Sequence, residues 1–119
     1  MRFVLLIYSN QASWEALSPE ERTALGQGHA TLHESLQESG ELAFGAGLAA
    51  TEATRTVRVR SGRLSVTDGP YAEAKEHLAG FYVVDCESPE RAAEIAARIP
   101  DASITGVEVR PVMMASPPD

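Results

Sequence analysis

Cysteine, positive charge and long apolar runs are all scarce in this sequence of 119 residues. The only cysteine is Cys86, so no disulfide can form within the chain, and we expect a cytoplasmic protein with Cys86 as a small core residue. The net charge of −7 argues against binding to nucleic acid or to an anionic membrane surface. The apolar run at residues 3–8 is too short for a signal peptide or a membrane span.

Several motifs of catalysis and cofactor binding are also missing. The sequence contains no Gly-x-Ser-x-Gly elbow, no P-loop and no Gly-x-Gly-x-x-Gly stretch after a strand. Residues 29–33 read His-Ala-Thr-Leu-His and therefore lack the His-Glu-x-x-His pattern of zinc hydrolases. The two histidines would need a third ligand to hold a metal, and we predict neither a metal nor a cofactor.

The composition, 44% hydrophobic and 23% charged, is that of an ordinary globular domain. We place a single domain at residues 1–113 and a disordered tail at residues 114–119. Apolar runs and period-two alternation predict strands at residues 3–8, 41–48, 55–60, 63–67, 78–85 and 104–112. A tight turn at residues 61–62 joins two of these strands into a hairpin.

Two similar segments begin helices. Ser18-Pro19-Glu20-Glu21 has the residues of an N-cap and a capping box, and this helix should end at Gly40. Ser88-Pro89-Glu90 repeats the pattern, and Pro100 should end the second helix. We expect residues 9–17 to form a loop.

The predicted order of elements is β-α-β, hairpin, β-α-β. This order favours an α+β domain of the ferredoxin-like, split βαβ type with an inserted hairpin, in which two helices cover one face of an antiparallel sheet. The opposite face needs a cover, and the chain has no further element to provide it. We therefore expect a homodimer in which the two sheets pack face to face.

His29 is the first candidate for chemistry, because it shares one stripe of the first helix with Leu25, Leu32 and Leu36. An imidazole on that stripe either acts as a general acid or base, or is a core histidine bonded to a backbone carbonyl. His33 lies one turn later, at the edge of the stripe, where it would bind a ligand or serve as a surface or packing residue.

Asp68-Gly69-Pro70-Tyr71 and the following Lys75 form the densest polar segment of the chain. Asp-Gly-Pro is good turn chemistry by itself. Alternatively, Asp68 takes part in a site in which Tyr71 and Lys75 hold an anionic group.

Arginines make the predicted hairpin basic in an acidic chain. We expect Arg58 and Arg60 to lie on opposite faces of the hairpin and to form no single binding stripe. Such a hairpin is either solvated or in contact with an acidic surface of a partner subunit.

The chain resembles the YCII-related proteins, in the branch with an Asp-Gly-Pro-Phe signature, in which Tyr71 here replaces the usual Phe. The matching segments cover nearly the whole chain and lie at residues 5–8, 17–22, 29, 66–76, 80–82 and 107–112. The resemblance implies a dimeric α/β-barrel of ferredoxin-like subunits. It also implies a histidine and an aspartate in a pocket, which match His29 and Asp68 here, although the family has no settled activity.

These features support two hypotheses. The first is a small dimeric enzyme that needs no cofactor and acts by acid/base chemistry on a small anionic or lactone-like molecule. His29 and Asp68 would be catalytic, and His33, Tyr71 and Lys75 would bind substrate. The second is a ligand-binding or regulatory dimer without catalysis. It predicts that backbone groups saturate His29 and that no pocket lies beside it.

Overall fold

The structure is a computed structural model that describes residues 1–70 and 75–114. Its main sheet has four antiparallel strands in the order β2-β5-β1-β6. The helices and strands, in chain order, are β1 (Arg2–Ser9), α1 (Gln11–Glu15), α2 (Pro19–Ser39), β2 (Leu42–Gly47), η1 (Thr51–Ala53), β3 (Arg55–Arg60), β4 (Arg63–Asp68), β5 (His77–Asp85), α3 (Pro89–Ala97), η2 (Pro100–Ser103) and β6 (Gly106–Pro111).

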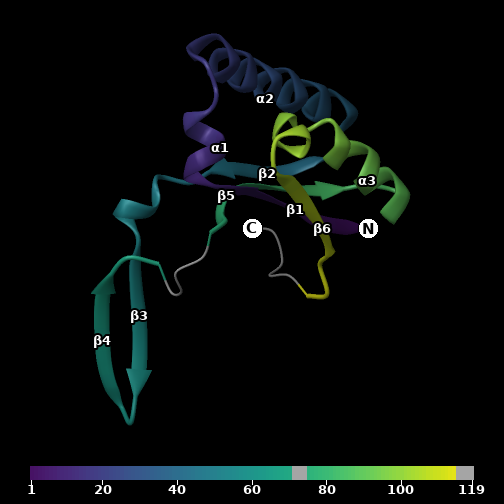
Figure 1. Ribbon diagram of the computed structural model, residues 1–119. Coiled ribbons are helices and arrows are strands. Elements are labelled where there is room, and N and C mark those ends of the chain that lie inside the picture. The colour runs from purple at the N-terminus through teal and green to yellow at the C-terminus, as the bar shows by residue number, and fades with distance from the viewer. Residues whose placement is uncertain (71–74, 115–119) are drawn as a thin grey trace.

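The architecture confirms the predicted α+β, ferredoxin-like fold. Helices α2 and α3 lie on one face of the main sheet, as Figure 1 shows, and the β3–β4 hairpin is inserted between β2 and β5. The six predicted strands all form, with shifts of one or two residues at most of their ends. The predicted tail overlaps residues 115–119, which lie outside the described part of the chain.

The core lies between the sheet and its two helices. Alternation along β1 turns Phe3, Leu5 and Ile7 toward the helices, where they are buried. The helices contribute buried side chains to the same core. These are Leu32 and Leu36 from α2, and Ala92, Ile95, Ala96 and Ile99 from α3 and its C-terminal end. Cys86 is also buried in this cluster, as the sequence predicts.

Both long helices begin as predicted. The Ser18 hydroxyl accepts a hydrogen bond from the backbone N–H of Glu21, and the Glu21 carboxylate accepts one from the N–H of Ser18. Gly40 ends α2 with a φ of 77°, a value that favours glycine. One prediction was wrong, because residues 9–17 contain the short helix α1 instead of a loop. Its N-cap is Asn10, whose side chain accepts from the N–H of Ser13.

The β3–β4 hairpin, called the arm below, extends from the sheet on the side away from the helices (Figure 1). Its strands pair from Arg55 opposite Asp68 to Arg60 opposite Arg63. The expectation that Arg58 and Arg60 lie on opposite faces was wrong, because residues two apart in a strand point to the same side. Arg58, Arg60 and Arg63 therefore share one face of the arm.

The sheet face opposite the helices carries apolar residues on β1, β2 and β5, with charged residues beside them on β6. It carries the alternate residues of the strands, among them Val4 and Leu6 from β1 and Phe81 from β5. Phe44 on β2 is 59% exposed, and its ring lies 6.0 Å from that of Phe81.

No helix within the described residues is long and apolar enough to cross a membrane.

An ion pair between Glu41 and Arg91 joins the start of β2 to α3. Arg91 donates from Nε to Glu41 Oε2 at 2.9 Å and from Nη2 to Oε1 at 2.8 Å. The hydrogen bonds from Arg91 are the main reason that the pKa of Glu41 falls from 4.5 to about 2. Because folding lowers this pKa, the pair stabilises the fold fully above pH 4.5, and the stabilisation is lost as the pH falls toward about 2.

We therefore expect the variant Glu41→Gln to lose part of the pH dependence of stability. Its free energy of unfolding should fall less between pH 4.5 and about 2 than that of the unchanged protein. Urea unfolding at a series of pH values measures this. The matched control is Glu38→Gln, which removes the same charge from an exposed position on α2. Equal slopes for Glu41→Gln and the unchanged protein would contradict the expectation.

Candidate functional site

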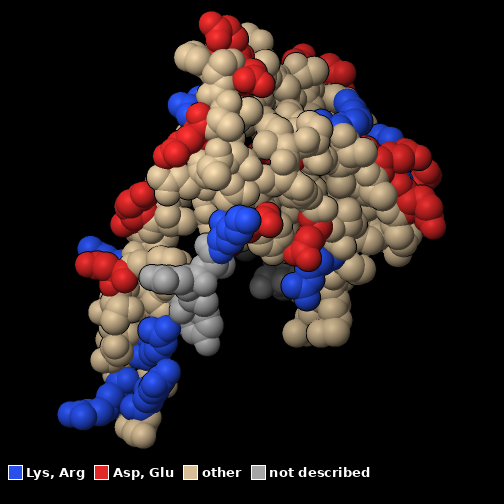
Figure 2. All heavy atoms as spheres, viewed as in Figure 1, with Lys and Arg blue, Asp and Glu red and all other residues tan. Residues whose placement is uncertain are grey.

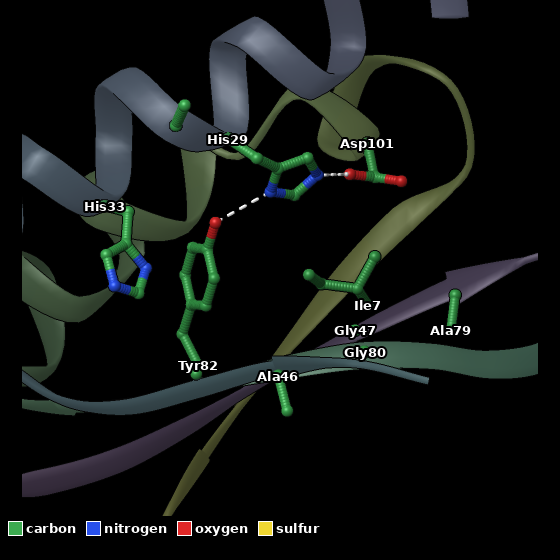
Figure 3. A pocket seen from close by; sticks show the side chains of 11 residues that line it. Ile7, His29, His33, Ala46, Gly47, Ala79, Gly80, Tyr82 and Asp101 are labelled. Atoms are coloured by element: carbon green, nitrogen blue, oxygen red, sulfur yellow. Dashed lines mark hydrogen bonds and ion pairs between the residues drawn. The ribbon is translucent and has the colours of Figure 1, made fainter. Parts of the chain in front are cut away.

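A pocket of about 360 Å³ opens between α2, the η2 turn and the edge of the main sheet. Figure 3 shows His29 and Asp101 above it, and the strands below. Its walls combine apolar or glycine positions with four residues that carry polar groups. The lining residues are Ile7, His29, Ala30, His33, Gly45, Ala46, Gly47, Ala79, Gly80, Tyr82 and Asp101.

His29 is held on both sides of its ring by polar side chains. Its Nε2 lies 2.6 Å from Asp101 Oδ1, and its Nδ1 lies 2.7 Å from the Tyr82 hydroxyl (Figure 3). A carboxylate can only accept, so Nε2 carries a hydrogen that it donates to Asp101. In the neutral imidazole Nδ1 then accepts from the Tyr82 O–H. The order Tyr82, His29, Asp101 is thus a continuous chain of hydrogen bonds, called the relay below.

The relay is partly shielded from water. The side chains of His29 and Asp101 are 29% and 14% exposed, and Tyr82 is buried. Burial raises the pKa of the Tyr82 hydroxyl above its ordinary value, and the negative charge of Asp101 raises it further. Tyr82 therefore keeps its proton at neutral pH and is available as a hydrogen-bond donor.

Each member of the relay is placed by a different element. His29 lies on the sheet-facing stripe of α2, three residues before the buried Leu32. Tyr82 points to the same space from β5, because the alternation of that strand turns Tyr82 and Val84 toward the helices. Asp101 comes from the η2 turn, which follows the buried Ile99.

Gly28 allows the η2 turn to approach α2. A Cβ atom at position 28 would lie only 2.6 Å from Cγ of Pro100, the residue before Asp101. The unusual glycine within the helix is therefore explained by close packing of the turn that carries Asp101. Gly26 has no such neighbour, since nothing lies within 4 Å of a Cβ placed there.

Two glycines in the strands make room on the floor of the pocket. A Cβ at Gly45 would lie 2.9 Å from Cδ1 of Tyr82, and one at Gly80 would lie 2.7 Å from the carbonyl oxygen of Ala46. Their lack of side chains lets Tyr82 lie over β2 and lets β2 approach β5 closely.

The predicted site residues fall in different places. His29 and His33 both line the pocket, and the His33 ring packs edge-on against Tyr82 with the centroids 6.5 Å apart. Asp68 is not among the lining residues: it ends the arm, its side chain is 95% exposed, and its carboxylate lies 3.9 Å from Nε of Arg55. Within one chain the structure does not bring Asp68 to His29. Lys75 is exposed and also absent from the lining, and Tyr71 lies outside the described residues.

Two residues of the site, Tyr82 and Asp101, were missed by sequence reasoning. Tyr82 had a weak signal, because period two places its hydroxyl on the helix-facing side of an otherwise apolar strand. Asp101 had none, because an aspartate after a proline at a helix end is ordinary turn chemistry. They lie 53 and 72 residues from His29 in sequence.

The polar side chains of the pocket are of types that exchange protons. The described residues contain no group of three or more His, Cys, Asp or Glu that could hold a metal ion. The relay links a hydroxyl, an imidazole and a carboxylate, which can take up a proton at one end and stabilise the resulting positive charge at the other.

This fold and pocket are those of a small α+β domain with a histidine-centred site, and comparison with known proteins identifies its family. The model of the YCII-related domain family matches residues 1–116. An uncharacterized protein of Rhizobium meliloti (strain 1021) is 34% identical over 119 residues, which cover 98% of this chain and 96% of that relative. The chain belongs to the YCII-related domain family.

Proposed function

We propose that this YCII-related protein is a cofactor-free acid/base enzyme whose centre is His29. The observation that carries the proposal is the relay: both ring nitrogens of His29 bond polar side chains, and the ring borders an open pocket. A histidine that served packing alone would need neither a carboxylate partner at 2.6 Å nor a hollow beside it.

The proton path follows from the directions of the hydrogen bonds. A substrate bound beside Tyr82 gives its proton to the Tyr82 oxygen while the Tyr82 proton moves to Nδ1 of His29. The imidazolium that forms has N–H groups at both nitrogens, and Asp101 stabilises its charge. Nδ1 then returns the proton through Tyr82 to another atom of the substrate.

The size and lining of the pocket support a particular class of substrate. About 360 Å³ accommodates a small molecule, and the apolar strand floor suits its carbon skeleton. His33 lines the pocket beside Tyr82, and we propose that it holds a carboxylate or carbonyl oxygen of the substrate. We therefore propose a small anionic or lactone-like substrate whose acidic proton lies next to a carbonyl group.

We further propose that the protein is a cytoplasmic homodimer of the Asp-Gly-Pro-Phe branch. The single buried cysteine supports the location, and the segment Asp68-Gly69-Pro70-Tyr71 supports the branch. The apolar residues on the sheet face opposite the helices, among them the exposed Phe44, support the dimer, because burying them against a second subunit would be stabilising. A substrate-binding or catalytic role for Asp68, Tyr71 and Lys75 remains part of this proposal. For Asp68 that role requires the pocket of a second chain.

Exchange of substrate hydrogen with solvent tests the proposed chemistry. We would incubate the protein in D₂O with small lactones and oxo acids and follow loss of the proton next to the carbonyl by NMR. The unchanged protein should catalyse exchange in at least one of them, and His29→Gln should abolish it. The control is His77→Gln, because His77 lines a different hollow near Trp14 and should leave exchange intact. Exchange that survives His29→Gln would refute the proposal.

The second candidate function is ligand binding without catalysis. Its expectation that backbone groups saturate His29 and that no pocket lies beside it was wrong, because side chains of Tyr82 and Asp101 bond the ring and a pocket adjoins it. The occupation of both His29 nitrogens by protein groups still favours this function, because it leaves neither nitrogen free to bond a substrate directly. Under this alternative the same compounds would shift the NMR signals of His29 and His33 without any exchange. The experiment in D₂O therefore separates the two functions.

A further inference from the structure

The arm carries an apolar face that nothing in the described chain covers. The pairing of β3 with β4 places Val57, Val59, Leu64 and Val66 on one side, opposite the face with Arg58, Arg60 and Arg63. The four aliphatic side chains are 59%, 66%, 70% and 53% exposed, respectively. A two-stranded ribbon with one exposed aliphatic face is only marginally stable by itself, and burying that face against another surface stabilises it.

Hydrogen bonds between its two sides close the base of the arm. The N–H of Gly69 donates to the carbonyl of Thr54 at 2.8 Å, and the Thr56 hydroxyl donates to the carbonyl of Gly69 at 2.7 Å. At the tip, Ser61 and Gly62 have φ values of 51° and 75°, which suit a tight hairpin turn. The arm is therefore a regular hairpin from base to tip, and its aliphatic side chains form one continuous face.

The charge of the arm is opposite to that of the rest of the chain. Residues 55–68 hold four arginines and one aspartate, a net charge of +3, which leaves −10 on the remainder of a chain whose net charge is −7. Figure 2 shows basic side chains gathered on the arm and acidic ones spread over the body. An acidic body attracts the arm of another copy and not a polyanion, whose approach the body would oppose.

We propose that the arm clasps the body of a second copy of this chain, with its aliphatic face buried and its arginines near acidic side chains of the partner. The proposal rests on the homodimer of the proposed function. The arm extends on the side of the sheet away from the helices, and this is the side on which the partner subunit would pack (Figure 1). Two such arms, related by the dimer axis, would embrace both bodies.

Substitution on the two faces of the arm tests the clasp. The variant Val57→Thr/Leu64→Thr removes two aliphatic contacts and keeps residues that favour strands. We expect it to raise the dimer Kd at least about tenfold, as measured by sedimentation equilibrium. The matched control Ser65→Thr changes the opposite face next to Leu64 and should leave Kd within about threefold.

Salt and cross-linking provide the second readout. Raising salt from about 0.1 M to about 1 M should weaken the unchanged dimer, and Arg60→Gln/Arg63→Gln should reduce that salt effect. A photoreactive amino acid placed at position 64 should cross-link two copies. Cross-links only within one chain would overturn the clasp.

The outcomes separate the clasp from the dimer itself. A stable dimer whose Kd is unchanged by Val57→Thr/Leu64→Thr would refute the clasp and leave the proposed homodimer standing. A protein that is monomeric at every concentration would refute both, while exchange of substrate hydrogen would still report on His29 independently.

Discussion

The variant Asp101→Asn should reduce catalysed exchange of substrate hydrogen about 10²–10⁴-fold. The asparagine amide is neutral, so it does not stabilise the positive charge that His29 acquires when Tyr82 passes a proton to Nδ1. The amide can also turn its NH₂ group toward Nε2, and this would favour the wrong ring tautomer. The rate of deuterium incorporation measures the loss, and ¹⁵N NMR of the His29 ring measures the tautomer.

A second aspartate provides the control for this variant. Asp85 is paired with Arg2 at the far end of β5, and Asp85→Asn makes the same chemical change there. We expect exchange within about twofold of the unchanged protein, because the effect of one charge at an exposed distant site is small. If Asp101→Asn and Asp85→Asn gave equal rates, Asp101 would have no part in the reaction.

The variant Gly28→Ala should both destabilise the protein and impair the site. The added Cβ would lie 2.6 Å from Pro100 Cγ, so the η2 turn must move away from α2. Overpacking of this kind costs about 1–3 kcal/mol, and the better helix propensity of alanine offsets about 1 kcal/mol of it. The displaced turn carries Asp101, whose 2.6 Å contact with His29 should lengthen or break. A shift of about 1 Å in a catalytic group can reduce the rate about 100-fold.

Gly26→Ala is the matched substitution, two residues earlier in the same helix. Nothing lies within 4 Å of the added Cβ, so only the helix propensity acts, and stability should rise by about 0.5–1 kcal/mol. Urea unfolding compares the two variants, and the ¹⁵N NMR spectrum of His29 shows whether Asp101 has moved. Stabilisation by both substitutions, with an unchanged His29 spectrum, would contradict the role assigned to Gly28.

Most of the fold was predictable because its determinants are local. The repeated Ser-Pro-Glu segments start α2 and α3, Gly40 ends α2, and apolar runs or period-two alternation mark the strands. The short helix α1 was missed, because five residues carry too little periodic signal to distinguish a helical turn from a loop. The prediction that Arg58 and Arg60 lie on opposite faces of the arm was wrong, because residues two apart in a strand point to the same side.

The site was predictable only in part. His29 stood out because an imidazole on an apolar helical stripe is unusual, and His33 followed from its position one turn later. The sequence also drew attention to Asp68, whose segment is rich in polar chemistry, whereas the carboxylate beside His29 belongs to Asp101. Nothing in the local sequence indicates that Asp101 and not Asp68 meets His29, because each lies next to a proline or a glycine.

The sequence by itself determined the elements, their order, the apolar stripe that carries His29 and the contrast between a basic hairpin and an acidic chain. Only the tertiary structure decided which side chains meet that histidine. Tyr82 and Asp101 reach His29 because β5 packs under α2 and because Gly28, which has no side chain, leaves room for the turn at Pro100. Contacts between residues 53 and 72 positions apart depend on packing in three dimensions, and local pattern does not encode them.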